Sequence, residues 1–262
     1  MLKAFAVKAV ALGACAAAVV ALPAALSIWA VVAIVGATIA FFAYTIAVPH
    51  SSFFTPVVCS LTPGQRAIAL SFDDGPDPVF TPRILDLLRE HHAHATFFVI
   101  GDRAIRHPEL IRRMHAEGHT VGTHTQHHRL RFHFGSRAYI QREICGAVDA
   151  IHSIISMRPT LFRPPQGLRT PFFASAWRML PDLVCVTWSV RGLDSLHTTA
   201  AAVVRRIEKR LVPGAIVALH DGTGLGGSAD REPTISALVS ILALCRARDL
   251  RCVALDQARF AI

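Results

Sequence analysis

Charged side chains are missing from one long stretch of this 262-residue sequence, since none occurs between Ala9 and Val48. A helix over these roughly 40 residues would be about 60 Å long, twice the thickness of the hydrocarbon core of a bilayer, so two membrane spans fit better than one. Pro23 and Ser27 are the residues that favour a turn between two spans. A cleaved secretory signal is disfavoured because the apolar run continues past Trp29 without a polar segment.

The flanks of this segment leave its orientation open. Lys3 and Lys8 mark the N-terminus as cytoplasmic under the positive-inside tendency. A hairpin of two spans would then leave the rest of the chain in the cytoplasm, whereas one long span would place it outside. We interpret residues 1–48 as a membrane anchor of one or two helices, 49–65 as a linker, and 66–262 as a single soluble domain.

The sequence also lacks any Cys-x-x-Cys, so neither a thiolate zinc site nor a redox pair is indicated. One of the six cysteines lies in the apolar segment, and the remaining five cannot all form disulfides with one another. We therefore expect free thiols in the core. The five are Cys59, Cys145, Cys185, Cys245 and Cys252.

Lysine is scarce, because all of the 27 basic residues except Lys3, Lys8 and Lys209 are arginine. The formal net charge of +9 would suit nucleic acid. The arginines are scattered rather than gathered in a stripe or a binding motif, so codon bias or attraction to anionic lipid headgroups is the better interpretation. We predict that the protein binds no nucleic acid.

Beyond the linker, predicted strands alternate with predicted helices, which indicates a parallel sheet or barrel. The sequence contains no internal repeat. Strands are predicted over residues 67–72, 95–99, 120–123, 161–163, 183–190, 215–219 and 251–254. Helices are predicted over residues 82–91, 108–117, 138–155, 172–179, 200–211 and 234–247.

Two adjacent carboxylates follow the first predicted strand, in the sequence SFDDGP. Asp73 and Asp74 at a strand end point in different directions, so one can bind a metal while the other acts as a base in metal-assisted hydrolysis. The alternative is a turn in which both side chains accept hydrogen bonds from local backbone N–H groups.

Histidines cluster in the sequence HTQHH, after the third predicted strand. His124 and His128 would share one face of a helix, and His127 offers the three-residue spacing instead. Together with Asp74, His124 and His128 make a site of two histidines and one carboxylate with open positions, which suits Zn²⁺ or another divalent transition ion. In a chain of 14 histidines an incidental pair is the alternative.

Further polar residues stand at the ends of later predicted strands. Arg163 opens the loop RPPQG and can form a forked ion pair with a carboxylate such as Asp73. His220, in VALHD, fits a general acid because it can deliver a proton near neutral pH. Asp194, in WSVRGLD, could hold His220 in the required tautomer. Each of these residues, taken alone, is more often structural.

Five ordered blocks resemble the polysaccharide deacetylase family, also described as NodB homology or carbohydrate esterase family 4, over residues 67–256. The blocks are SFDDGP at 71–76, HTQHH at 124–128, RPPQG at 163–167, WSVRGLD at 188–194 and VALHD at 217–221. The resemblance implies a distorted, incomplete (β/α) barrel with its site at the C-terminal ends of the strands. It also implies hydrolysis of the N-acetyl group of an amino sugar, with release of acetate.

The resemblance assigns acid and base roles to four of these residues. Asp73 corresponds to the catalytic base and Arg163 to the residue that orients it. His220 corresponds to the catalytic acid and Asp194 to the partner of that acid.

The resemblance also implies a metal site and contacts with the substrate. We expect one divalent metal ion, most suitably Zn²⁺, with Co²⁺ or Ni²⁺ as alternatives. The residues that correspond to its ligands are Asp74, His124 and His128. The backbone N–H of Gln166 is implied as a donor to the oxyanion. Val217 and Leu219 are implied as the wall of the slot for the acetyl methyl group.

Three positions depart from the family pattern. The family usually has an aromatic residue at the position of Gln166, a Trp at that of Ser195 and often an Asp at that of Arg191. A platform for stacking sugars is therefore missing, and the substrate differs from the long polymer typical of the family. We expect an N-acetylated amino-sugar glycan or glycolipid, from peptidoglycan or a lipid-linked saccharide.

Alternatives to this function remain at the level of sequence. One is an O-acetyl esterase or a deformylase on the same fold, and another is a non-catalytic membrane protein that binds glycan. The predicted partners are the sugar substrate and the lipid bilayer. Family habit slightly favours a catalytic domain outside the cytoplasm of a bacterial-type cell.

Overall fold

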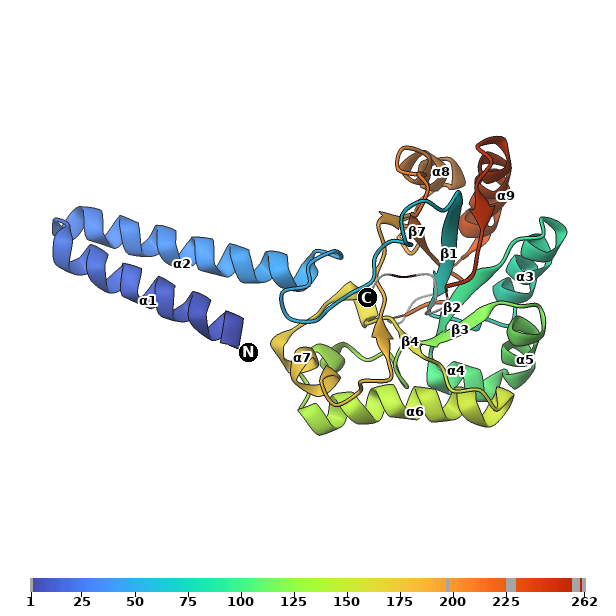
Figure 1. Ribbon diagram of the computed structural model, residues 1–262, viewed down its shortest axis with the longest axis horizontal. Coiled ribbons are helices and arrows are strands. Elements are labelled where there is room, and N and C mark those ends of the chain that lie inside the picture. The colour runs from blue at the N-terminus through green and yellow to red at the C-terminus, as the bar shows by residue number, and fades with distance from the viewer. Residues whose placement is uncertain (1, 197, 225–229, 256–259, 261–262) are drawn as a thin grey trace.

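A hairpin of two long helices precedes an α/β domain in the computed structural model, which describes residues 2–196, 198–224, 230–255 and 260 (Figure 1). Helix α1 (Leu2–Ala21) and helix α2 (Ala24–Ala47) lie antiparallel and in contact. The turn between them is at Leu22 and Pro23, as proline favours, whereas the hydroxyl of Ser27 donates to the carbonyl of Ala24 inside α2.

Both helices are long and apolar enough to cross a membrane. Their 20 and 24 residues correspond to about 30 and 36 Å, which matches the hydrocarbon core. Large apolar side chains on both helices are exposed, with Leu12 at 75%, Val20 at 88% and Trp29 at 72%. The hairpin is therefore a pair of candidate transmembrane segments.

The domain is built on a parallel sheet in the order β5-β4-β3-β2-β1-β7-β6, with β8 paired to the start of β1. Strand β1 is central and fully buried. The strands are β1 (Ala67–Asp73), β2 (Ala95–Val99), β3 (Thr120–Thr123), β4 (Leu161–Phe162), β5 (Val184–Cys185), β6 (Val190–Arg191), β7 (Ile216–His220) and β8 (Arg251–Cys252).

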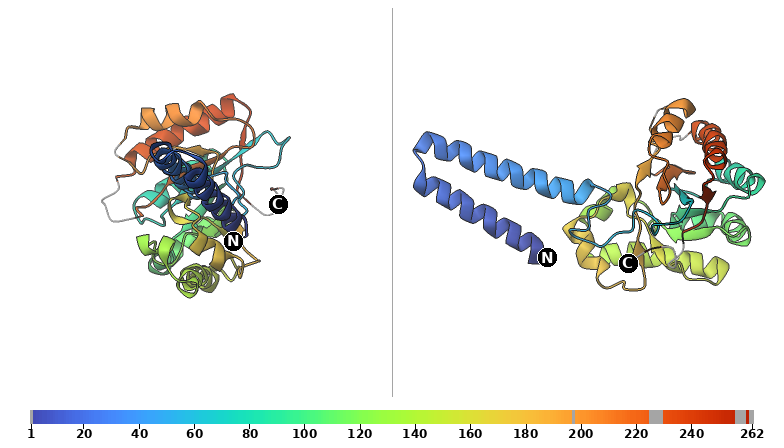
Figure 2. Two further views of the ribbon diagram at one scale, coloured as in Figure 1. Left: turned by 90° about the vertical axis from the view of Figure 1, so that its left-hand side faces the viewer. Right: turned by 45° about the horizontal axis from the view of Figure 1, so that its top comes forward.

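Helices surround this curled sheet, and successive helices pack on one another around it (Figure 1 and Figure 2). The helix α4 was not expected from the sequence. The helices are α3 (Phe80–Glu90), α4 (Gly101–Arg106), α5 (Pro108–Ala116), α6 (Arg137–Ile155), α7 (Pro171–Trp177), α8 (Ala200–Glu208) and α9 (Glu232–Ala247), with the short 3-10 helices η1 (Leu130–Phe134) and η2 (Pro165–Gly167).

The single strand predicted over residues 183–190 is wrong. It is two short strands, β5 and β6, that lie at opposite edges of the sheet. The chain between them crosses the open side of the barrel, where Val186 pairs with Val58 of the segment expected to be a linker. That segment also buries Leu61 and packs as part of the domain. The expected incomplete, distorted barrel is confirmed.

All six cysteines are free, as expected. Only Cys185 and Cys245 are fully buried, and the other four are half-buried.

Candidate active site

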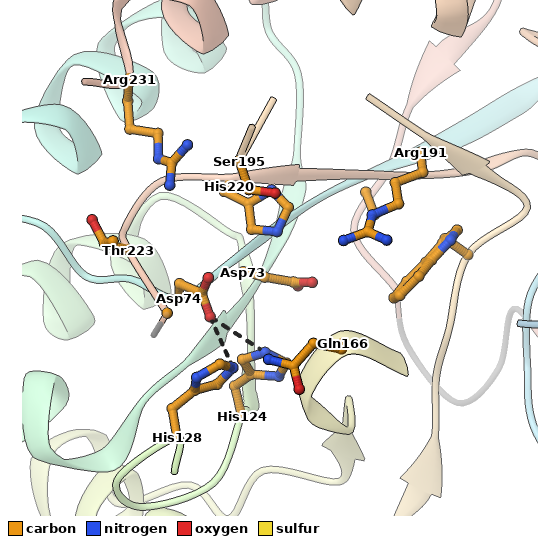
Figure 3. A pocket seen from close by; sticks show the side chains of 13 residues that line it. Asp73, Asp74, His124, His128, Gln166, Arg191, Ser195, His220, Thr223 and Arg231 are labelled. Carbon is orange, nitrogen blue, oxygen red and sulfur yellow. Dashed lines mark ion pairs between the residues drawn. The ribbon is translucent and has the colours of Figure 1, made fainter. Parts of the chain in front are cut away.

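The polar residues singled out from the sequence converge at the carboxyl ends of the parallel strands, around a cavity of about 180 Å³ (Figure 3). Asp73 ends β1 and His220 ends β7, and the two are paired in register. Parallel strands end at the same edge of a sheet, so side chains at their ends can meet. The cavity is lined by Asp73, Asp74, His124, His128, Gln166, Trp188, Arg191, Ser195, Ala218, His220, Thr223, Gly224 and Arg231.

One carboxylate and two imidazoles form a cluster on one side of this cavity. Asp74 Oδ1 lies 3.4 Å from Nε2 of His124 and 3.3 Å from Nε2 of His128. The three residues are buried, and one ligand atom of each lies within 4.8 Å of the others. Within the described part of the chain, Asp74 Oδ1 has no hydrogen-bond partner. The donor set is that of a divalent transition metal site.

The protonation of this cluster also fits a metal. The ring Nδ1 of His124 lies 2.7 Å from the carbonyl oxygen of Arg163, which only accepts, so Nδ1 carries the proton and Nε2 presents its lone pair. Burial, together with His124, lowers the pKa of His128 to about 4, so its imidazole is neutral at physiological pH. Burial raises the pKa of Asp74, but the neighbouring basic groups, which are the two histidines together with His220 and Arg103, outweigh burial and hold this pKa below its usual value.

The backbone at Asp74 is held in an uncommon conformation. Its φ is +73°, in the left-handed region that non-glycine residues rarely occupy. Arg103 donates to the carbonyl oxygen of Asp74 at 2.8 Å, and a Cβ at Gly222 would lie 2.3 Å from the same oxygen. The loop therefore fixes the carboxylate toward the two histidines at the cost of local strain.

His127 lies outside this cluster. Its Nδ1 lies 2.7 Å from Glu143, and its backbone N–H donates to the same carboxylate at 3.1 Å. The geometry therefore favours the pair His124 and His128 over the pair with three-residue spacing.

Asp73 faces the cavity beside a buried arginine. Nη1 of Arg163 donates to Asp73 Oδ1 at 2.7 Å and to the hydroxyl of Ser71 at 2.9 Å, and Nη2 donates to the carbonyl of Thr187. Arg163 is fully buried, so its direction is fixed by these bonds. The bond to Arg163 holds the Asp73 carboxylate in a fixed orientation at the cavity.

His220 and Asp194 form the second ion pair of the site. Nδ1 of His220 donates to Asp194 Oδ1 at 2.9 Å, so Nε2 is the ring nitrogen that this ion pair does not use. Thr234 and the backbone N–H of His220 donate to Oδ2, each at 2.8 Å. Burial lowers the pKa of His220, but the Asp194 charge outweighs it and raises the pKa to about 9. His220 is thus protonated near neutral pH.

Comparisons with known proteins agree with this geometry. The polysaccharide deacetylase family model matches residues 60–179. A peptidoglycan-N-acetylglucosamine deacetylase of Bacillus cereus is 34% identical over 194 residues, which cover 74% of this chain and 88% of that protein. The chain belongs to the polysaccharide deacetylase family.

Two further similarities each cover two thirds or more of this chain. A chitooligosaccharide deacetylase of a Bradyrhizobium species is 38% identical over 182 residues, which cover 67% of this chain and 82% of that protein. The structure of the peptidoglycan deacetylase PdaC from Bacillus subtilis aligns with a TM-score of 0.66 and 31% identity, over 75% of this chain and 91% of that one.

The assignment of Val217 and Leu219 to the substrate slot of this polysaccharide deacetylase is wrong. Both side chains are fully buried in the apolar core between the sheet and the helices. Side chains alternate along a strand, so the residue of β7 that faces the cavity together with His220 is Ala218. Gln166 does line the cavity, and its side-chain oxygen accepts from Nε2 of His133 at 2.7 Å.

Five residues that line the cavity were not found from the sequence: Trp188, Ala218, Thr223, Gly224 and Arg231. Trp188 lines the cavity and belongs to the WSVRGLD block, from which Asp194 was chosen as a candidate. Ala218 was overlooked because its neighbours in sequence have larger side chains. Arg231 donates at 2.9 Å to the carbonyls of Gly222 and Asp194, and it stands in no recognisable motif. Only the fold brings it to the site, since it precedes α9.

Proposed function

We propose that this polysaccharide deacetylase hydrolyses the N-acetyl group of an amino sugar in a metal-dependent reaction that releases acetate and a free amine. One observation carries the proposal: a metal-ligand set, a carboxylate held by an arginine and a protonated imidazole face one cavity. Binding of a glycan alone requires neither a base nor an acid.

The residues present fit a metal, and Asp74, His124 and His128 would hold it. When bound, it supplies Lewis-acid stabilisation to the acetamide carbonyl and to the oxyanion that develops. Zn²⁺ suits two imidazoles and a carboxylate, with Co²⁺ or Ni²⁺ as alternatives.

Proton transfers are divided between the two ion pairs. Asp73, oriented by Arg163, accepts a proton from the attacking water as the water oxygen bonds to the acetyl carbon. The backbone N–H of Gln166 stabilises the tetrahedral oxyanion. His220 then donates its proton to the sugar nitrogen as the C–N bond breaks, and Asp194 stabilises the charged form of His220 until that step.

We place the catalytic domain on the cytoplasmic face of the membrane. The hairpin of α1 and α2 supports this because it returns the chain to the side on which it starts (Figure 1). Lys3 and Lys8 lie at that starting side and favour the cytoplasm. Polymeric peptidoglycan, which lies outside the membrane, is then out of reach of this domain.

The position of the cavity supports a substrate at the membrane surface. The backbone N–H of Arg169 donates to the carbonyl of Ile46 at 3.1 Å, and its guanidinium donates to that of Val48, both at the end of α2. Gln166, which lines the cavity, is three residues away and hence at most about 11 Å along the chain. A lipid-linked N-acetylated amino sugar in the bilayer can therefore reach the site.

A substrate panel tests the reaction. The purified full-length protein, loaded with Zn²⁺, is incubated with matched N-acetyl, O-acetyl and N-formyl amino sugars, and acetate, formate and new amine are measured. We expect acetate and amine in equal amounts from the N-acetyl sugar. Release of acetate from the O-acetyl sugar alone would assign an esterase instead, and formate from the N-formyl sugar alone a deformylase.

A further inference from the structure

Arg191 is the arginine of the cavity whose guanidinium has no polar partner in the described part of the chain. Among the residues the structure describes, its guanidinium makes no hydrogen bond or ion pair, and its contact is with the ring of Trp188, 5.2 Å from Cζ. Arg231, the other arginine lining the cavity, is bound to two backbone carbonyls, and Arg163 is bound to Asp73. The donors of Arg191 are thus available to a ligand.

The position of Arg191 fits a contact with the sugar. It ends β6, where it pairs in register with Ala218 of β7, and it is half-buried at the cavity. Figure 3 shows its guanidinium directed toward the middle of the pocket, on the side of Asp73 and His220. Its contact with Trp188 restrains the side chain, so fewer rotamers are lost when a ligand binds.

The charge around the cavity also favours an anion. Its lining carries two carboxylates, of which Asp73 is paired with Arg163 and Asp74 faces the two histidines. Against these stand Arg191 and Arg231, whereas the charge of His220 is balanced by Asp194, and a divalent metal would add further positive charge. A neutral sugar would leave the charge of Arg191 uncompensated in a partly desolvated site.

We propose, on the basis of the deacetylase function above, that Arg191 determines specificity by binding an oxyanion carried by the substrate, a phosphate on the sugar. The planar guanidinium can bind two phosphate oxygens at once. The class of substrate is therefore an N-acetylated glycosyl phosphate, in agreement with the position of the cavity beside the end of α2. A sugar carboxylate offers the same chemistry and is distinguished by the test.

The test compares three N-acetylated sugars that differ in charge: N-acetylglucosamine 1-phosphate, N-acetylmuramic acid and neutral methyl N-acetylglucosaminide. For the wild type we expect the highest kcat/KM with the phosphate. Arg191→Gln should lower kcat/KM for the phosphate roughly 10- to 100-fold more than for the neutral sugar, the range for one charge-assisted hydrogen bond. Arg205→Gln, which removes an exposed charge on α8, is the matched control and should change neither.

Binding gives a readout that does not depend on turnover. Calorimetry on Asp73→Asn, with and without Arg191→Gln, should give tighter binding of the phosphate sugar only where Arg191 is present. Equal losses for charged and neutral sugars would overturn the inference and make Arg191 a structural residue, while the deacetylase function would stand. A preference for the carboxylate sugar would overturn the phosphate assignment. No amine from any of the three sugars, with no difference in binding, would overturn both.

Discussion

The metal ligands give the first test at the level of single residues. Asp74→Ala or His124→Ala removes one donor from the cluster, so metal content measured by mass spectrometry should fall well below one equivalent. His128→Ala should behave in the same way. His127→Ala is the matched control and should keep the metal, because His127 binds Glu143 instead. If His127→Ala lost the metal and His128→Ala kept it, the ligand would be His127 and not His128.

Variants of the acid and of the base should differ from variants of the metal ligands in the same assay of metal content. Asp73→Asn and His220→Ala leave the three ligands in place, so we expect both variants to retain metal. Turnover should fall by roughly 10²- to 10⁴-fold in each, the usual contribution of a general acid or base. Retained metal with undiminished turnover would remove the residue from the mechanism.

The pKa of His220 predicts the alkaline side of the pH profile. As the acid, His220 must be protonated, and its pKa of about 9 keeps it so through neutral pH; kcat should therefore fall as the pH rises past about 9. Asp194→Asn removes the charge that raises this pKa and leaves burial, which lowers it. The fall should thus begin at a lower pH in the variant. An unmoved alkaline limb would show that another group titrates there.

The acid, the base and the metal ligands could be predicted because each stands in a quoted block that follows a strand, whereas Arg231 stands in none of the blocks and could not. The direction of apolar side chains could not. Val217 and Leu219 flank His220 in sequence, yet strand alternation turns both into the core and leaves Ala218 at the cavity. The choice between His127 and His128 also required the fold, because it depends on Glu143 of α6.

At the level of elements, Arg169 joins the membrane hairpin to the catalytic domain. Its guanidinium is buried and donates to the carbonyls of Gly167 and Val48. Arg169→Met should leave the carbonyl of Gly167 without a donor among the described residues, whereas the carbonyl of Val48 keeps the backbone N–H of Ser51. We expect a cost of about 1–3 kcal/mol, measured as a lower Tm of the protein in detergent. Arg178→Met, at the C-cap of α7 where the arginine is exposed, is the matched control and should leave the Tm nearly unchanged.

Most strand and helix positions followed from periodicity, and the exceptions are helix α4 and the short strands at the edges of the sheet. β5 and β6 have two residues each, too few to show a period, and the apolar residues between them suggested one strand. Their separation to opposite edges is a property of the curled sheet and of its pairing with Val58. A sequence pattern does not carry that long-range pairing.

At the level of the whole molecule, the hairpin predicts the side of the membrane. A fluorescent reporter fused at the C-terminus should label the cytoplasm, because the chain enters and leaves on the side of Lys3 and Lys8. The same reporter inserted after Leu22, at the turn, is the matched control and should lie outside. A C-terminal reporter found outside would refute the cytoplasmic assignment and return polymeric peptidoglycan to the accessible substrates.

The most direct measurement is a metal titration of the full-length protein after chelation, followed by acetate release from an N-acetylated amino sugar. We predict no turnover in the metal-free protein and a linear rise with added Zn²⁺ that ends at one equivalent. Acetate and free amine should appear in equal amounts. Full turnover without metal, or one equivalent of bound metal without any acetate, would contradict the account.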